Sequence, residues 1–218
     1  LELVAVAACL VLCIAIPLGV YAGAYPKRAS SKLIMSGSIL GISLPSFWVG
    51  MMMIYIFAVV LRLLPASGRG NTVMVGNVAL SIFAPGGIRY VILPAITLAL
   101  TNVATMLRLT RSGILENMRQ DYIKFARAKG VPAKSILFGH ALKNALIPVV
   151  TIFGMDLGNM IAFTTITETI FAWPGMGKLL IDAINKSDRP IIVAYLMAAA
   201  CMFVVLNFIV DILYTLID

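Results

Sequence analysis

Five long apolar stretches, separated by polar segments, set the pattern of hydrophobic and polar positions along the chain. Four of them carry no charged residue and cover residues 3–26, 33–61, 90–107 and 191–210. The fifth, residues 144–167, contains Asp156 as its only charge. A helix of about 20 apolar residues crosses the ~30 Å hydrocarbon core of a bilayer, and these stretches lack the alternation of barrel strands. The pattern therefore predicts an all-α polytopic membrane helix bundle with five spans in a single domain, residues 1–218.

The composition agrees with a membrane protein. Apolar residues make up 61% of the 218 residues and charged residues 12%, whereas soluble proteins average about 45–50% and about 25%. The net charge of +8 could suggest a nucleic-acid partner, but eleven of the 17 basic residues lie within residues 27–32 and 108–143. Basic residues concentrate on the cytoplasmic loops of membrane proteins. The bias therefore predicts cytoplasmic first and third loops, a cytoplasmic C-terminus and no nucleic-acid partner.

This orientation places residue 1 outside the cell. A chain ordinarily reaches that side only after an exported leader or an earlier span. The first apolar stretch is too long for a signal peptide and lacks its basic flank. We therefore expect an upstream sixth helix that precedes Leu1.

Pairs of glycines four residues apart occur in three of the apolar stretches. They are Gly19 and Gly23, Gly37 and Gly41, and Gly154 and Gly158. Small residues at this spacing let helix backbones approach closely in lipid, although they are also common in membrane helices generally. The pairs favour a compact bundle.

Residues 121–148 form a polar segment that interrupts an otherwise mostly apolar chain. Lys124, Arg127 and Lys129 lie beside Tyr122 and Phe125, which indicates a short helix along a surface. A helix commonly ends at a glycine in the left-handed conformation, and the residue before a proline disfavours helix, so Gly130 and the Val131–Pro132 pair end this one. A second short helix, about residues 133–140, would run into the next apolar stretch. The segment is thus a helix, a sharp turn and a helix between two spans.

The second apolar stretch contains an internal proline flanked by polar residues. Pro45 removes a backbone donor and frees a carbonyl at membrane depth, which is tolerated where protein or a water-filled cavity satisfies it. Ser43, Ser46 and Trp48 are therefore candidates for lining a pathway together with Pro45. Trp48 also suits ordinary packing.

Asp156 is an ionisable residue within a span, where a charge is costly and commonly functional. Two interpretations stay open: a pathway-lining carboxylate that meets a cationic group, and a structural partner for a neighbouring helix. A secondary transporter or channel that uses Asp156 is the alternative function.

Two further polar segments are expected on the outer side. Residues 65–87 are rich in glycine and proline and contain a short amphipathic element around residues 73–83. Residues 168–190 are too polar to span but have an apolar side, which favours a scoop that dips into the bundle, followed by an amphipathic helix. Gly175 and Gly177 flank Met176 as a flexible turn; a phosphate-binding loop is excluded because the first glycine and the Ser or Thr of that motif are lacking.

The residues that carry catalytic or metal chemistry are sparse. Cys9, Cys13 and Cys201 lie in apolar stretches and are interpreted as small buried hydrophobic residues. The single histidine, His140, has no convincing nucleophile and orienting carboxylate, so it is interpreted as an interface or capping residue. The sequence predicts neither an enzyme nor a metal site nor a bound cofactor.

Three groups of residues carry a resemblance to a known family. The first is Ala126-Arg127-Ala128-Lys129-Gly130, then nine residues, then His140-Ala141-Leu142-Lys143-Asn144-Ala145-Leu146-Ile147-Pro148. The second is Glu168-Thr169-Ile170-Phe171 with Trp173-Pro174-Gly175-Met176-Gly177, and the third is Leu206 to Tyr214. In order and spacing they resemble the permease subunits of bacterial ABC importers, within them the dipeptide, oligopeptide and nickel permease family. The chain matches the general cytoplasmic EAA motif only in part: Lys124 stands at the position of the Glu of the motif, and Phe125 at the position of its second Ala.

The resemblance implies a type I ABC importer permease fold in the bacterial plasma membrane. Residues 119–143 then correspond to the loop that couples to an ATPase, and residues 168–190 to the outer gate. The implied partners are a paralogous permease subunit, two ATPase subunits that hold ATP and Mg²⁺, and an extracytoplasmic solute-binding protein. The implied mechanism is alternating access, with di- or oligopeptides, glutathione or nickel chelates left open as substrates. The coupling residues are expected to be Ala126, Arg127, Ala128, Lys129, Gly130, His140 and Asn144, and the outer-gate residues Glu168, Trp173 and Gly175.

Overall fold

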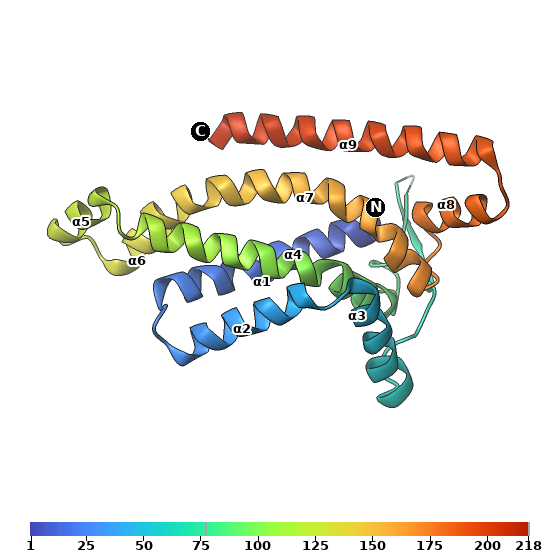
Figure 1. Cartoon of the computed structure of the whole chain (residues 1–218), viewed down its shortest axis with the longest axis horizontal. Helices are drawn as coiled ribbons and strands as arrows, with labels where there is room; N and C mark the ends of the chain where they lie inside the picture. The colour runs from blue at the N-terminus through green and yellow to red at the C-terminus, as the bar shows by residue number, and fades with distance from the viewer. Residues whose placement is uncertain (77, 218) are drawn as a thin grey trace. The chain divides into compact units, whose positions relative to one another are not determined.

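The computed structural model describes residues 1–76 and 78–217, and Figure 1 traces their elements in chain order. The side chains of residues 210, 211 and 213–217 lie outside the described part, and so does the end of the C-terminal motif that includes Asp211 and Tyr214.

Helices account for most of the described chain. The long ones are α1 (Glu2–Ala24), α2 (Ala29–Ser43), α4 (Ile88–Asn117), α7 (Leu142–Ile170) and α9 (Arg189–Ile217). The short ones are α3 (Ser46–Met53), α5 (Asp121–Ala128), α6 (Ala133–Ser135) and α8 (Met176–Asn185). Two stretches of π-helix, η1 (Ile54–Val60) and η2 (Ile136–Ala141), follow α3 and α6.

The predicted spans correspond to these helices. Within the described residues, four continuous helices are long and apolar enough to cross a membrane, namely Glu2–Ala24, Ile88–Asn117, Ala133–Ile170 and Arg189–Ile209. A bent pair, α2 and the α3–η1 helix, supplies the fifth if it counts as one span. The break lies at Leu44 and Pro45, as expected for a proline that cannot continue a helix. The predicted second coupling helix is continuous with the span that follows it.

The chain divides into two compact units that share the long helices. The first unit comprises residues 1–10, 44–100 and 157–206, and the second comprises residues 11–43, 101–156 and 207–218. Each unit is described separately below.

The second unit packs α1, α4 and α7 closely through glycines. A methyl group on Gly19 would lie 2.6 Å from Cβ of Thr110, and one on Gly23 would lie 2.7 Å from Cβ of Ile114. This pair therefore lets α1 approach α4, as the four-residue spacing predicts. The prediction is wrong for Gly37, which has open space around it.

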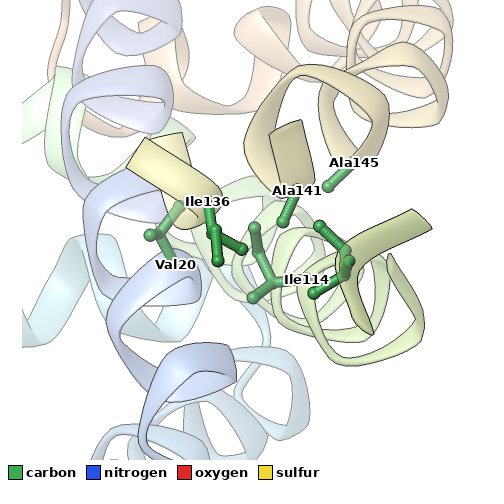
Figure 2. Close-up of a cluster of buried hydrophobic side chains, with 6 residues drawn as sticks. Val20, Ile114, Ile136, Ala141 and Ala145 are labelled. Atoms are coloured by element: carbon green, nitrogen blue, oxygen red, sulfur yellow. The ribbon is translucent and has the colours of Figure 1, made fainter. Parts of the chain in front are cut away.

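A buried apolar cluster forms the core of the second unit (Figure 2). It contains Val20, Ile114, Ile123, Ile136, Ala141 and Ala145. Its members come from α1, α4, α5 and the η2–α7 helix. The cluster thus joins the polar segment after α4 to the membrane helices of its own unit.

The first unit contains a two-stranded antiparallel hairpin, which the sequence did not predict. Its strands β1 (Val73–Val75) and β2 (Val78–Leu80) pair with Val73 opposite Leu80. The β-branched valines favour strands, so a short hairpin replaces the amphipathic element expected around residues 73–83. Also in this unit, the N–H of Gly68 donates to the carbonyl of Phe171 (2.9 Å), which ties the loop before the hairpin to the turn after α7.

The predicted burial of the three cysteines is wrong. Cys9, Cys13 and Cys201 are exposed on this chain and do not pack in its core. Trp48 is 42% exposed on this chain, and its two interpretations, pathway lining and ordinary packing, stay predictions. A run of apolar residues locates a membrane helix. It does not distinguish the side that faces lipid from the side that faces protein, because both sides are apolar.

Candidate functional site

The turn between α5 and α6 has the geometry that a glycine at its centre requires. Gly130 has φ +78, in the left-handed region. Its N–H donates to the carbonyl of Arg127 (3.0 Å), and the N–H of Val131 donates to that of Ala126 (3.1 Å). This pair of hydrogen bonds is the Schellman motif that terminates helices at a left-handed residue. The predicted helix end at Gly130 is therefore confirmed.

A single buried side chain anchors α5 to the second unit. Ile123 is fully buried in the apolar cluster, beside Ile114 of α4 and Ile136 of η2. Ala126 and Val131 are partly buried against the same cluster. Burying one isoleucine stabilises the docked position by about 1.5–3 kcal/mol relative to an exposed one. We call α5, the Gly130 turn and η2, residues 121–141, the coupling segment.

The opposite side of α5 is exposed and carries three basic residues. Lys124, Phe125, Arg127 and Lys129 are all exposed, and Phe125 is 62% exposed. The ammonium of Lys129 lies 4.4 Å from the centre of the Phe125 ring. The sequence places Arg127 and Lys129 on different sides of a helix, but both side chains are exposed because α5 ends between them. This face presents cations around one aromatic ring.

An exposed ion pair lies at the start of α5. The Lys124 ammonium is 2.8 Å from a carboxylate oxygen of Asp121, and its hydrogen bond and charge lower the pKa of that carboxyl. Both side chains are exposed, so the pair contributes little to stability. Asp121 also lies at the helix N-terminus, where its charge complements the helix dipole.

Three polar side chains clasp α5 to α4 and α7. The hydroxyl of Tyr122 donates to Oδ1 of Asn117 (2.9 Å), and Nδ2 of Asn144 donates to the Tyr122 oxygen (2.9 Å). Asn117 in turn donates from Nδ2 to the carbonyl of Gly113 (2.9 Å) within α4. Asn144 was expected in the site, whereas Asn117 and Tyr122 were missed because no spacing rule pairs a residue at 122 with partners at 117 and 144. The clasp orients α5 about its Ile123 anchor.

The structure brings together most of the predicted coupling residues. Ala126, Arg127, Ala128, Lys129 and Gly130 form the last turn of α5 and the residues that follow it. Asn144 joins them through Tyr122. His140 lies in η2 and is exposed, so it belongs to the same segment without lying in the clasp.

Replacing Tyr122 with phenylalanine is expected to loosen α5 without unfolding the protein. The ring is retained, but the hydroxyl that accepts from Asn144 and donates to Asn117 is lost. Two exposed hydrogen bonds contribute about 0.5–1.5 kcal/mol each. We expect faster hydrogen exchange of the α5 amides with unchanged exchange in α4. The control is Tyr55→Phe, which removes an exposed hydroxyl in η1; equal exchange of α5 in both variants would contradict the clasp.

Glu168, near the end of α7, forms the centre of a second candidate site, in the first unit. Its carboxylate is buried and accepts the N–H groups of Gly177 (2.7 Å) and Lys178 (3.1 Å), in the first turn of α8. A carboxylate at this position satisfies otherwise unpaired donors and complements the dipole of α8. Glu168 thus holds α8 against the end of α7.

Two glycines make this approach possible. A methyl group on Gly175 would overlap the Glu168 carboxyl, and one on Gly177 would lie 2.5 Å from Cα of Thr165. Gly177 lies within α8, so the expectation of a flexible Gly175–Gly177 turn is corrected: these glycines allow close packing. The bend itself is at Ala172, whose φ of 45 is left-handed.

A partly buried ion pair links the hairpin region to α1 in the same unit. The Glu2 carboxylate accepts from Nη2 of Arg69 (2.7 Å) and from the N–H groups of Ser81 (2.6 Å) and Ile82 (2.9 Å). Arg69 also donates to the carbonyl of Ala79 (2.5 Å), and its guanidinium lies 5.7 Å from the centre of the Trp173 ring. Neither Glu2 nor Arg69 was predicted. Their signal in the sequence was an acidic residue next to an apolar run and an arginine between two glycines.

The predicted gate residues Glu168, Trp173 and Gly175 line one pocket of 690 Å³ together with Glu2 and Arg69. Among the described residues of this unit, Pro45, Ser46 and Trp48 are not part of its lining. In the second unit, Ser43 donates from its hydroxyl to the carbonyl of Ile39 (2.9 Å) within its own helix. Asp156 is half-buried in α7. The pathway roles of Ser43, Pro45, Ser46, Trp48 and Asp156 therefore stay predictions.

Comparison with known proteins shows which family this chain resembles. Residues 15–218 match the family described as binding-protein-dependent transport system inner membrane component. The chain is 42% identical over 195 residues to a di/tripeptide transport system permease protein of Pseudomonas aeruginosa. The aligned region covers 84% of this chain and 58% of that protein. It is 40% identical over its whole length to an oligopeptide transport system permease protein of Bacillus subtilis, 67% of which is covered.

The chain spans about six tenths of the first of these relatives and two thirds of the second. It is also 34% identical over 200 residues to a glutathione transport system permease protein of Escherichia coli, with 92% of this chain and 60% of that protein covered. Among solved structures, an inward-facing MetNI methionine ABC transporter matches with a TM-score of 0.74 at 15% identity, covering 100% of this chain and 93% of the other. That match shows that the fold is the one found in this transporter.

Proposed function

Because the chain belongs to the family of binding-protein-dependent transport system inner membrane components, we propose that it is the membrane-spanning subunit of an ATP-driven importer. The proposal assigns ATP hydrolysis to separate subunits and solute capture to an extracytoplasmic binding protein. A second permease subunit, paralogous or identical, completes the pathway. The first and third loops and the C-terminus lie in the cytoplasm of a bacterial cell, as the eleven basic residues on one side favour.

The coupling segment is the observation that carries this proposal. Ile123 and the Tyr122 clasp fix α5 to three membrane helices, while the opposite face of α5 is left exposed with Phe125 at its centre. An element that is anchored on one side and exposed on the other suits the transfer of motion from another subunit. Movement of α5 would be passed to α4 and α7 through these contacts.

The substrate class that we propose is short peptides. It is supported by the names of the relatives, which are permeases for di- and tripeptides, dipeptides, oligopeptides and glutathione. All of these solutes contain amide bonds and charged termini. Transport would proceed by alternating access, in which the ATPase pair draws the coupling segments together and opens the cavity outward, and hydrolysis restores the inward-facing state.

The test uses the complete transporter in sealed vesicles. We expect uptake of a labelled dipeptide to require ATP on the side of the coupling segment and to persist when a protonophore collapses the proton gradient. The variant Asp156→Asn is expected to keep this dependence on ATP. A secondary carrier that used Asp156 would instead take up the peptide without ATP, stop when the gradient collapses, and lose uptake in Asp156→Asn.

A further inference from the structure

An apolar pocket of 460 Å³ lies within the second unit, beside the coupling segment. One wall is the C-terminal part of α1, from Ile16 to Ala24, with Tyr25 directly after it; the other is formed by Met118, α6, η2 and the start of α7. The volume falls within the range of about 300–1,000 Å³ that small-molecule sites occupy. The pocket is therefore large enough for part of an elongated apolar molecule.

The lining changes from apolar to polar along α1. Ile16, Pro17 and Val20 line the inner part, and Tyr21 and Tyr25 line the outer part. Tyr25 follows Ile16 by nine positions, which is a rise of about 13.5 Å along a helix. An occupant that follows this wall needs an apolar body and a polar end.

Cations surround the outer end of the pocket. Lys134 is part of the lining, and the guanidinium of Arg28 lies 4.2 Å from the centre of the Tyr25 ring. Among the described residues that line the pocket, none is acidic. The outer end thus favours a negatively charged group and offers a donor at the Tyr21 hydroxyl, which also contacts the Ser30 hydroxyl (2.8 Å).

We propose that this pocket binds one acyl chain of an anionic phospholipid, with the headgroup phosphate at Lys134 and Arg28. The end of a membrane span that carries tyrosines and cations is where headgroups lie, and basic pockets on the cytoplasmic side of membrane helices bind anionic lipids. The inner residues Ile16, Pro17 and Val20 contact the acyl chain. The proposal rests on the cytoplasmic position of the coupling segment but not on which solute is transported.

The pocket shares walls with the cluster that anchors α5. Val20 is a member of the buried cluster, and Met118, Leu137 and Leu142 pack against it while also lining the pocket. A lipid chain in the pocket therefore packs against residues that hold the coupling segment. Anionic lipid is expected to rigidify that segment.

The test measures lipid retained by the complete transporter after purification. The protein is equilibrated in nanodiscs with equal amounts of phosphatidylglycerol and phosphatidylcholine of the same chains, extracted into detergent, and the bound lipid is counted by native mass spectrometry. We expect wild-type protein to retain phosphatidylglycerol in preference to phosphatidylcholine. Lys134→Gln should lower phosphatidylglycerol retention about five-fold, the effect of about 1 kcal/mol for one basic residue near the headgroup.

Two further variants locate the site. Ala24→Phe places a ring in the pocket and should remove retention of both lipids, while Lys186→Gln makes the same charge change at an exposed position after α8 and should have no effect. Equal retention of the two lipids by wild-type protein overturns the proposal without recourse to any variant. Equal losses of phosphatidylglycerol retention in Lys134→Gln and Lys186→Gln also overturn the proposal, because the preference for this lipid would then depend on the net charge of the protein and not on the pocket. Loss of ATP-dependent uptake in wild-type vesicles would contradict the proposed function and leave lipid retention unaffected.

Discussion

Replacing Gly130 with valine is expected to leave the protein in the membrane and to abolish substrate-stimulated ATP hydrolysis. Gly130 has φ +78, and a β-branched residue strongly disfavours that region, at a cost of about 1–3 kcal/mol. The strain is relieved by opening the turn, which breaks the Schellman hydrogen bonds of Gly130 and Val131. The exposed face of α5 then loses its fixed orientation relative to η2. We measure ATP hydrolysis and peptide uptake by the reconstituted transporter.

Two controls separate backbone strain from other effects of the substitution. Gly130→Asn should retain most of the activity, because asparagine tolerates the left-handed region. Gly37→Val introduces the same side chain into α2, outside the coupling segment and with open space around the new Cβ, and should be close to wild type. If Gly130→Val showed wild-type stimulation of ATP hydrolysis and wild-type peptide uptake, the coupling segment would not be the element that links ATP hydrolysis to transport.

Replacing Glu168 with alanine is expected to release α8 from α7 and to lower peptide uptake at least ten-fold. The substitution leaves the N–H groups of Gly177 and Lys178 without their acceptor, and Gly177 is buried. Each unsatisfied buried donor costs about 1–3 kcal/mol, and the lost side chain leaves a gap beside Gly175. The measurement is hydrogen exchange of the α8 amides in the assembled transporter, with uptake measured in parallel.

Two control variants test whether the lost carboxylate causes the effect. Glu168→Gln keeps an acceptor oxygen and the side-chain volume, so α8 should stay protected and uptake should fall less. Glu116→Ala removes an exposed glutamate of α4 and should change neither measurement. Wild-type exchange of α8 in Glu168→Ala would show that the carboxylate does not hold the helix.

The sequence predicted the elements that depend on local chemistry. Runs of apolar residues located the helices, Pro45 located the break in the second span, and Gly130 located the turn after α5. These features follow from hydropathy, a missing donor and a left-handed backbone, and each is specified by residues close together in the chain. The hairpin was missed because only three residues form each strand, too few for alternation to emerge.

The contacts that assemble the two candidate sites could not be predicted in the same way. Tyr122 meets a residue 22 positions away, and Glu2 meets backbone groups 79 and 80 positions away. Such pairs depend on how the helices pack. The sequence does not reveal this packing, because lipid-facing and protein-facing positions are both apolar. Glu168 was singled out by the resemblance, but its role as the acceptor for α8 follows only from the close approach that Gly175 and Gly177 permit.

The open surroundings of Gly130 imply that this position is specified by chirality and not by size. Apart from Gly130 itself and its two neighbours in the chain, no heavy atom lies within 4 Å of the place where its Cβ would be, so a side chain meets no steric obstacle from the rest of the fold. The obstacle is that L-residues place their Cβ unfavourably at positive φ, while their mirror images prefer that region. A D-amino acid of almost any volume would therefore satisfy the turn where its L-counterpart does not. Among the genetically encoded residues, the achiral one is the natural solution at a site whose handedness is opposite to that of the helix it ends.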